Sequence, residues 1–322
     1  MSTGSNKPVV VIEDSVISNN VKELKSMAEV ITMSPYAGVD KWIIAVKDAV
    51  AVIDRKMRLS KEVLDAAPAL KLIARTGIGV DETRIDLNEV RRRNIVVTYN
   101  PGINSDSVAE LTVMLALSIY RKLFILNRYV REAKWAEGQS NLGNQIKGKA
   151  WGFIGFGNAG THVANIVKSF GCSINAYDPY LNKQAIVERG GNPLELDALL
   201  RQCDIISIHV PLMDSTKHLI GERELNLMKK DAILINVSRG GIVDDTALYR
   251  ALKGGKLRGA GLDTLEDEPI HVTNPLLTMD NVIITPHIGG STHEAVIAGA
   301  ELAVNEVVRL LKGEKPLSPY KL

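Results

Sequence analysis

The chain has 322 residues, of which 45% are hydrophobic and 24% charged, and its formal net charge is +2. This composition excludes a disordered chain, and it gives no reason to expect a nucleic acid or a membrane surface as the main partner. The length favours two domains, because single hydrophobic cores usually stop growing before this size.

Neither a targeting segment nor a disulfide framework is evident. Residues 1–8 are polar, and the longest apolar run, residues 111–120, is about half of the roughly 20 residues that a spanning helix needs. Cys172 and Cys203 each lie beside an apolar run and are interpreted as small buried hydrophobes. We expect a soluble protein of the cytoplasm, where thiols stay reduced.

The first hundred residues alternate short apolar runs with amphipathic stretches. They predict strands at 9–12, 49–53, 70–74 and 95–97, and helices at 16–27, 61–67 and 85–93. Because strands that alternate with helices form βαβ units, this part is predicted to be an open α/β domain with a parallel sheet.

A long helical segment follows, from about Ser107 to Trp135. Ser107 and Glu110 fit a capping box, which predicts a helix start at Ser107. The segment is either one long helix, which could cross between domains or supply a dimer face, or two shorter helices with a bend near Tyr120. The expectation of a homodimer depends on this segment.

A second α/β run begins near residue 150. It predicts strands at 150–154, 173–177, 204–210, 232–237, 259–262 and 282–284, with helices at 159–170, 196–202, 222–230 and 245–253. Ser291 and Glu294 fit a second capping box, which predicts a last helix running to about Lys312.

The segment Gly155-Phe156-Gly157-Asn158-Ala159-Gly160 lies between a predicted strand and a predicted helix, as a dinucleotide fingerprint does. Gly155 permits the tight turn, Gly157 lets the backbone approach a pyrophosphate, and Gly160 lets the helix pack closely. The free N–H groups of the helix start would face the phosphates. Asp178 ends the next strand. Its carboxylate can accept hydrogen bonds from ribose hydroxyls and would repel a 2′-phosphate, which favours NAD.

Three later segments carry polar residues directly after predicted strands: residues 236–241 with Arg239, residues 263–269 with Glu266 and Glu268, and residues 285–290 with His287. Ligands of open α/β sheets bind beyond the carboxyl ends of the strands, so these side chains are expected to converge on one cleft. No HExxH motif or Cys/His cluster indicates a metal.

Taken together, these motifs closely resemble those of the D-isomer-specific 2-hydroxyacid dehydrogenases, most of all the phosphoglycerate dehydrogenases and the glyoxylate and hydroxypyruvate reductases. The resemblance covers nearly the whole chain and rests on Arg75–Asp81, Ser107–Glu110, the fingerprint, the Arg239 segment, Asp267–Pro269 and the His287 segment. We expect two Rossmann-like α/β domains with a cleft between them. Residues 1–105 and 297–322 would form the substrate-binding domain, and residues 106–296 the NAD-binding domain.

The resemblance also implies roles for individual residues. His287 would be the general acid/base, Glu268 would hydrogen-bond and orient its imidazole, and Arg239 would hold the substrate carboxylate. The backbone N–H groups of Ile78 and Gly79 would bind the same carboxylate. Glu266, the nearest rival carboxylate, is expected to face solvent. The other residues implied to bind the cofactor are His209, Val210, Pro211, Val237, Ser238, Asp263, Gly289 and Gly290.

Two departures from the commonest family pattern affect the substrate and the cofactor. Asp54 stands where members that handle phosphoglycerate often carry an arginine, whereas Arg75 agrees with that branch and could bind an anionic tail. Asn158 replaces a frequent arginine and is expected to weaken NAD binding somewhat.

The interpretation is an NAD-dependent oxidoreductase acting on D-3-phosphoglycerate and 3-phosphohydroxypyruvate, with glyoxylate or hydroxypyruvate as the alternative substrate. A hypothesis of another class is an NAD(H)-sensing protein, like the family members that act as transcriptional corepressors.

Overall fold

The computed structural model describes residues 7–16, 18–80 and 84–321. The chain divides into two compact units, Met1–Asn104 with Ser291–Leu322 (unit 1) and Ser105–Gly290 (unit 2). Each unit is an α/β structure on a parallel sheet, which confirms the fold class predicted from the alternation of strands and helices. Among the described residues, no helix combines the length and the apolar character needed to span a bilayer.

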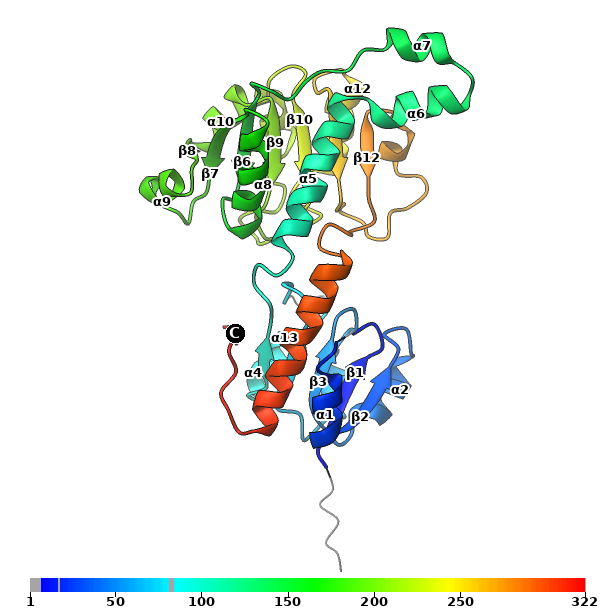
Figure 1. Ribbon diagram of the computed structural model, residues 1–322, viewed down its shortest axis with the longest axis vertical. Coiled ribbons are helices and arrows are strands. Elements are labelled where there is room, and N and C mark those ends of the chain that lie inside the picture. Colours follow the sequence, from blue (N-terminus) through cyan, green and yellow to red (C-terminus); the bar gives the residue numbers. More distant parts are fainter. Residues whose placement is uncertain (1–6, 17, 81–83, 322) are drawn as a thin grey trace, which may run out of the picture. The chain divides into compact units, whose positions relative to one another are not determined.

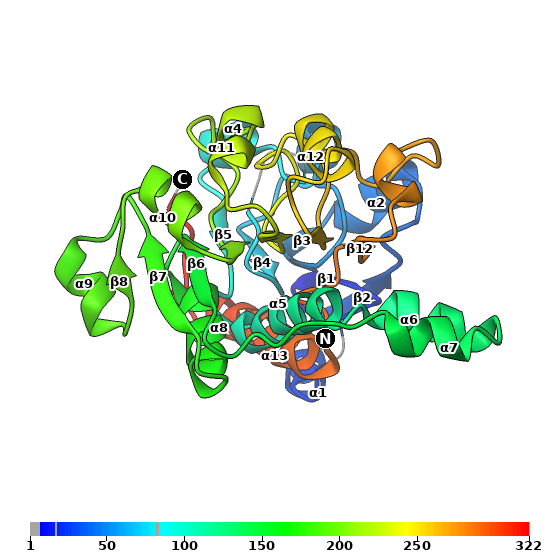
Figure 2. The same ribbon diagram turned by 90° about the horizontal axis from the view of Figure 1, so that it is seen from above.

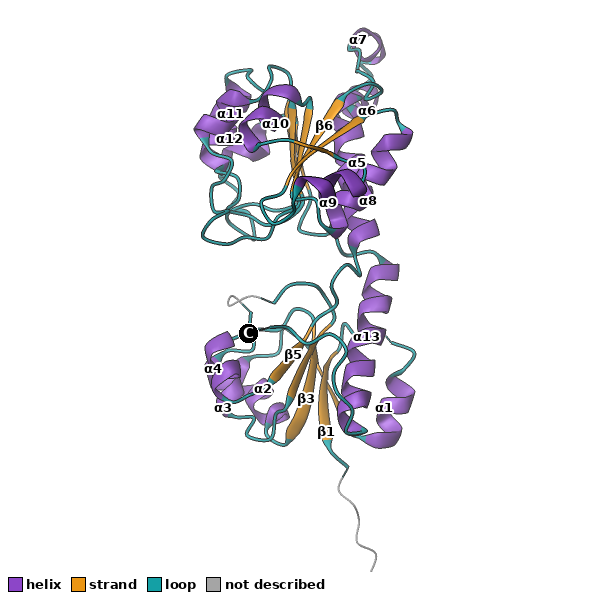
Figure 3. Ribbon diagram, turned by 90° about the vertical axis from the view of Figure 1, so that its left-hand side faces the viewer, coloured by secondary structure: helices purple, strands orange, loops and turns teal. Residues whose placement is uncertain are grey.

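Unit 1 contains a parallel sheet with helices on both faces (Figure 3). In sheet order its described strands are β2 (Glu29–Met33), β1 (Val9–Glu13), β3 (Ala49–Asp54), β4 (Leu72–Arg75) and β5 (Val96–Thr98). Helices α1 (Val21–Met27) and α13 (His293–Leu311) cover one face, and α2 (Val39–Val46), α3 (Lys61–Asp65) and α4 (Leu87–Arg92) cover the other. The strand order reverses between β1 and β3, whose last residues are Glu13 and Asp54. Such a switch point is where ligands of open sheets bind.

Unit 2 has the larger sheet, whose order reverses between β6 and β9 (Figure 1). Its described strands, in sheet order, are β12 (Val282–Ile284), β11 (Gly259–Leu262), β10 (Ile233–Asn236), β9 (Ile205–Ile208), β6 (Ala150–Ile154), β7 (Ser173–Tyr177) and β8 (Asn192–Pro193). One face packs against α5 (Ser105–Tyr120) and α8 (Asn158–Ser169). The other packs against α10 (Leu196–Gln202), α11 (Glu222–Leu227) and α12 (Asp245–Lys253). A short helix, α9 (Lys183–Glu188), and a 3-10 turn, η1 (Pro275–Thr278), complete the described elements of this unit.

The sequence pattern located most strands but missed elements at the sheet edges. β2, α2, β8 and α9 were not predicted, and the helix expected from residue 16 begins only at Val21. β2 is an edge strand in which no residue is fully buried, so it lacks the apolar run that marks the central strands. Residues 16 and 18–20 are not helical, and Ile17 lies outside the described residues.

Both predicted capping boxes are misplaced. Helix α5 begins at Ser105, so Ser107 lies inside it, and α13 is capped by Thr292, whose side chain accepts the N–H of Ala295. Of the two alternatives for the segment 107–135, the shorter helices are confirmed. The helix breaks after Tyr120, where Lys122 adopts a left-handed conformation with φ of 53°.

After that break, α6 (Leu123–Arg131) and α7 (Trp135–Ser140) extend from unit 2 away from its sheet (Figure 1, Figure 2). Neither helix has a buried residue, although α6 is strongly amphipathic in sequence. Leu123, Phe124, Val130 and Trp135 are each more than half exposed. An apolar helix face exposed to this extent is unusual for a monomer.

Candidate active site

Three loops follow the adjacent parallel strands β10, β11 and β12 of unit 2. Arg239 lies in the loop after β10, Glu268 in the loop after β11, and His287 in the loop after β12. Because the strands are parallel neighbours, all three loops leave the same edge of the sheet.

His287 and Glu268 form a direct pair. Nδ1 of His287 lies 2.7 Å from Oε2 of Glu268, and the two side chains are 40% and 39% exposed. A carboxylate only accepts, so Nδ1 carries a proton and Nε2 remains available to another partner. Partial burial raises the pKa of Glu268, but the hydrogen bond and charge of His287, the N–H of Leu265 and the charge of Arg239 outweigh it. The pKa of Glu268 therefore lies below its ordinary value, and the carboxylate stays ionised.

Asp263, the first residue after β11, shapes the loop that carries His287. Its buried carboxylate accepts hydrogen bonds from the Thr285 hydroxyl, from the Ile288 N–H at 2.9 Å and from the Gly289 N–H at 2.7 Å. His287 itself has a φ of 54°, and its N–H donates to the Asp263 carbonyl at 2.9 Å. These bonds hold His287 in the left-handed region, which few residues other than glycine adopt.

Asn236, the last residue of β10, shapes the Arg239 loop in the same way. Its side-chain oxygen accepts the Ser238 N–H at 3.1 Å, and its amide donates to the Arg239 carbonyl at 2.9 Å. The next residue, Gly240, lies so close to the β11 loop that an added Cβ would sit 1.7 Å from the Leu265 carbonyl oxygen. The Arg239 and Glu268 loops are therefore in direct contact.

The fingerprint residues form the turn from β6 into α8. Gly155 has a φ of +87°, and a Cβ on Gly160 would lie 2.6 Å from the Gly155 carbonyl oxygen, so both positions require glycine for the fold. A Cβ on Gly157 would meet no atom within 4 Å. The carboxylate of Asp178 at the end of β7 accepts the Phe156 N–H at 2.9 Å, which places an acidic group beside this turn.

His209 follows β9 across the switch point from this turn. Its backbone and the side chain of Val210 would contact a Cβ on Gly155. Burial lowers the pKa of His209 to about 3, so its ring is neutral. Its Nε2 is 2.9 Å from the Ser207 hydroxyl, and among the described atoms its buried Nδ1 has no hydrogen-bond partner.

In unit 1, Ile78 and Gly79 belong to the loop after β4, and hydrogen bonds from buried residues fix the backbone of this loop. Arg75 donates from Nε to the Gly79 carbonyl at 3.1 Å, and Asn100 donates its N–H to the Gly77 carbonyl at 3.1 Å. The Arg75 guanidinium is 4% exposed and pairs with the fully buried carboxylate of Asp54. Burial raises the pKa of Asp54 to about 6, although the charge of Arg75 opposes the rise.

Residues 113–289 match the family model described as D-isomer specific 2-hydroxyacid dehydrogenase, NAD binding domain. This match covers more than half of the chain. The chain belongs to the D-isomer specific 2-hydroxyacid dehydrogenases. It is accordingly an NAD-dependent oxidoreductase, as the fingerprint predicted.

The relatives of this chain among the D-2-hydroxyacid dehydrogenases are named for different substrates. The glyoxylate reductase of Thermococcus litoralis is 38% identical over 96% of both chains. The D-3-phosphoglycerate dehydrogenase of Methanocaldococcus jannaschii is 37% identical over 95% of this chain, which spans 58% of that protein. Among solved structures, D-lactate dehydrogenase from Aquifex aeolicus, complexed with NAD and lactic acid, is 31% identical and has a TM-score of 0.80, with 95% and 96% of the two chains covered.

The nucleotide end of this D-2-hydroxyacid dehydrogenase fits NAD on its own geometry. The space over Gly157 leaves the backbone N–H groups at the start of α8 accessible, and a twelve-residue helix directs its positive end to that space. The carboxylate of Asp178 lies at the same end, where it accepts the Phe156 N–H. Asn158 is exposed in the first turn, where it supplies no charge.

The sequence predicted Arg239, Glu268 and His287 as site residues of this dehydrogenase, but it did not indicate the side chains that shape their loops. Asn236 and Thr285 were read only as parts of motifs, yet each donates to or accepts from a loop that carries a site residue. Their signal is a polar residue at the last position of a strand or directly after it.

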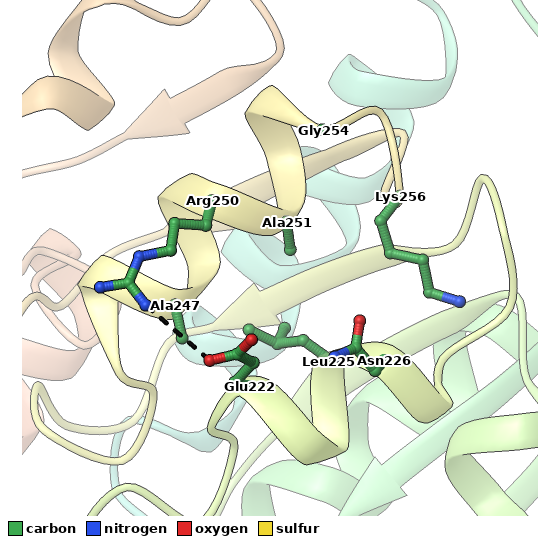
Figure 4. Close-up of a pocket in the computed structure, with 8 residues that line it drawn as sticks. All are labelled: Glu222, Leu225, Asn226, Ala247, Arg250, Ala251, Gly254 and Lys256. Atoms are coloured by element: carbon green, nitrogen blue, oxygen red, sulfur yellow. Dashed lines mark ion pairs between the residues drawn. The ribbon is translucent and has the colours of Figure 1, made fainter.

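The pocket in Figure 4 lies elsewhere in unit 2, between α11 and α12. There Arg250 faces Glu222 at 3.8 Å, and Asn226 and Lys256 also line the hollow. None of its lining residues belongs to the predicted site, so this pocket plays no part in the assignment of function.

Proposed function

We propose that this dehydrogenase reduces a short, unphosphorylated 2-keto acid of the glyoxylate or hydroxypyruvate type. The observation that carries the proposal is the buried pair of Asp54 and Arg75. A substrate phosphate needs a cation that is not already neutralised, and the one arginine that agrees with the phosphoglycerate branch is paired and 4% exposed. Asp54 adds a negative charge beside the loop of Ile78 and Gly79.

The loop geometry of unit 2 supports the roles proposed for Arg239, Glu268 and His287. His287 gives the proton to the C2 oxygen of the keto acid from Nε2 and takes it back in the reverse direction. Glu268 holds the ring by Nδ1 and stabilises its protonated form. Arg239 holds the substrate carboxylate and polarises the carbonyl, and the N–H groups of Ile78 and Gly79 bind the same carboxylate. When bound, the nicotinamide cofactor supplies or accepts the hydride at C2.

The cofactor contacts of the proposal use residues at the same sheet edge. Asp178 accepts from the ribose hydroxyls, and the N–H groups of Gly157 to Ala159 face the pyrophosphate. His209, Val210 and Pro211 line the cofactor from β9. Asp263 remains a candidate for the nicotinamide amide, although three donors of the His287 loop already occupy its carboxylate. Val237, Ser238, Gly289 and Gly290 complete the set.

The second candidate substrate is 3-phosphohydroxypyruvate, with D-3-phosphoglycerate in reverse. Arg55, Lys56 and Arg58 directly follow Asp54, and their side chains are at least partly exposed. Their positive charges could bind a substrate phosphate, whereas the charges of Asp54 and Arg75 neutralise each other. This alternative requires the phosphate to be bound by side chains other than Arg75.

The test is NADH oxidation with glyoxylate, hydroxypyruvate and 3-phosphohydroxypyruvate, compared by kcat/KM in the wild type and in Asp54→Asn. We expect hydroxypyruvate or glyoxylate to be the best wild-type substrate. Asp54→Asn should raise the relative kcat/KM for the phosphorylated acid about tenfold, because it frees the charge of Arg75. A wild type that prefers the phosphorylated acid would refute the proposal. Tight NADH binding without turnover of any of the three would favour the NAD(H)-sensing hypothesis.

We further propose that the protein is a homodimer whose interface includes α6 and α7. The support is their exposed apolar set, Leu123, Phe124, Val130 and Trp135. Light scattering after size exclusion should give twice the chain mass of 35.1 kDa, and Phe124→Glu should lower it. A wild-type mass of one chain at micromolar concentration would contradict the proposal.

A further inference from the structure

Asp245 is the first residue of α12, yet its carboxylate does not cap that helix. The cap is Asp244, whose Oδ1 accepts the Ala247 N–H at 2.9 Å. Oδ2 of Asp245 instead accepts the backbone N–H of Glu266, at 3.1 Å, in the loop that carries Glu268. Asp245 therefore acts on a neighbouring loop.

The peptide group between Leu265 and Glu266 lies at the contact between two catalytic loops. Its carbonyl oxygen packs against Gly240 of the Arg239 loop, and its N–H is the one that Asp245 accepts. The preceding N–H, of Leu265, donates to Oε1 of Glu268 at 3.2 Å. The Leu265 N–H belongs to the adjacent peptide group, which shares the Cα of Leu265 with this one. A shift of the Leu265–Glu266 peptide would therefore reach the donor to Oε1 of Glu268 through that Cα, while His287 holds Oε2.

The Glu266 side chain adds a second connection to the Arg239 loop. Its Oε1 lies 2.7 Å from Nε2 of His218, and the backbone N–H of His218 donates to the Gly241 carbonyl at 2.7 Å. The sequence predicts that Glu266 faces solvent. The residue is exposed, but its carboxylate also pairs with His218. An exposed pair such as His218 and Glu266 contributes little to the free energy of unfolding. Its expected effect is to hold the loop that carries Glu268 in position.

The surroundings of Asp245 are costly for a carboxylate. Burial, opposed by the N–H of Glu266 and reinforced by the charges of Glu266, Asp244 and Asp267, raises the pKa of Asp245 to about 6. An asparagine could accept the same N–H without that cost. A carboxylate whose pKa is perturbed in this way is typical of functional sites.

We propose that Asp245 is a positioning residue that, with His218, fixes the Leu265–Glu266 peptide and thereby the orientation of Glu268 toward His287. The inference rests on the proposed role of Glu268. It predicts that the effect of Asp245 on turnover passes through Glu268.

The test is a double-mutant cycle. Asp245→Ala should lower kcat about tenfold, the equivalent of one hydrogen bond, with unchanged NADH binding by fluorescence titration. Asp245→Asn should recover most of kcat, because its amide oxygen still accepts the Glu266 N–H. In a Glu268→Gln background, Asp245→Ala should have little further effect. Glu222→Gln, which removes a first-turn acid from neighbouring α11, is the matched control.

A loss from Asp245→Ala that is equally large in the Glu268→Gln background would overturn the inference, as would normal kcat in Asp245→Ala. If Asp245→Ala does not fold, His218→Gln can replace it in the double-mutant cycle with Glu268→Gln, and the expected loss of kcat is smaller. Failure of the proposed function is distinguishable, because Glu268→Gln alone would then leave turnover unchanged or the wild type would turn over no keto acid.

Discussion

Replacing Glu268 by glutamine tests the proposed site most directly. The amide oxygen of glutamine still accepts the His287 Nδ1 proton, so the ring keeps its orientation, but the negative charge beside the imidazolium is lost. A hydrogen bond to a charged group contributes about 1.5–3 kcal/mol. Because the two side chains are 40% and 39% exposed, solvent screening places the effect at the lower end.

The expected result is a kcat reduced about 10- to 30-fold, which corresponds to roughly 1.5–2 kcal/mol of lost transition-state stabilisation. The assay is NADH oxidation with hydroxypyruvate, together with NADH binding by fluorescence, which should be unchanged.

Asp267→Asn is the matched control, because Asp267 is the exposed carboxylate next to Glu268 in the same loop. It should leave kcat within about twofold of the wild type. The assignment of the His287–Glu268 pair would be refuted if Glu268→Gln behaved like this control while NADH bound normally.

Further predictions concern the cofactor turn, the thiols and the pH dependence of stability. Gly157→Ala should fold with an unchanged Tm, because its Cβ meets no atom within 4 Å, but should bind NADH more weakly in a fluorescence titration, whereas Gly160→Ala should lower Tm. Equal Tm losses would contradict this distinction. Cys172 and Cys203 are buried, and burial raises the pKa of Cys203 to about 12, so a thiol reagent at pH 8 should label neither before denaturation. The pKa of Glu268 is lowered by folding, so its stabilisation is lost as pH falls. The Tm difference between the wild type and Glu268→Gln should therefore become smaller when the pH is lowered below 4.5, the ordinary pKa of a glutamate.

The sequence was sufficient to locate the central strands and to predict which side chains lie at the ligand-binding edge. A buried parallel strand is a continuous apolar run, and a polar residue that follows it lies at the ligand-binding edge. Asp178, Arg239 and His287 could therefore be placed at that edge from their positions, while their proposed roles came from the family resemblance. Gly155 and Gly160 could also be assigned, because the turn and the close helix contact admit no side chain.

The sequence did not indicate the edge elements or the helix starts. β2 and β8 are too exposed or too short to show an apolar pattern, and a capping box one or two residues away matched as well as the residues that cap α13. Local patterns of this kind are weak when several serines and threonines precede a helix.

The tertiary structure alone decided the state of the charged residues. The sequence presents Asp54 and Arg75 as two conflicting signals 21 positions apart, and only the pairing of β3 with β4 makes them one buried ion pair. Likewise Asp245, Glu266 and His218 come from three segments that meet only when the sheet is assembled. The energy of a charge depends on its neighbours and its solvent, and those are properties of the fold.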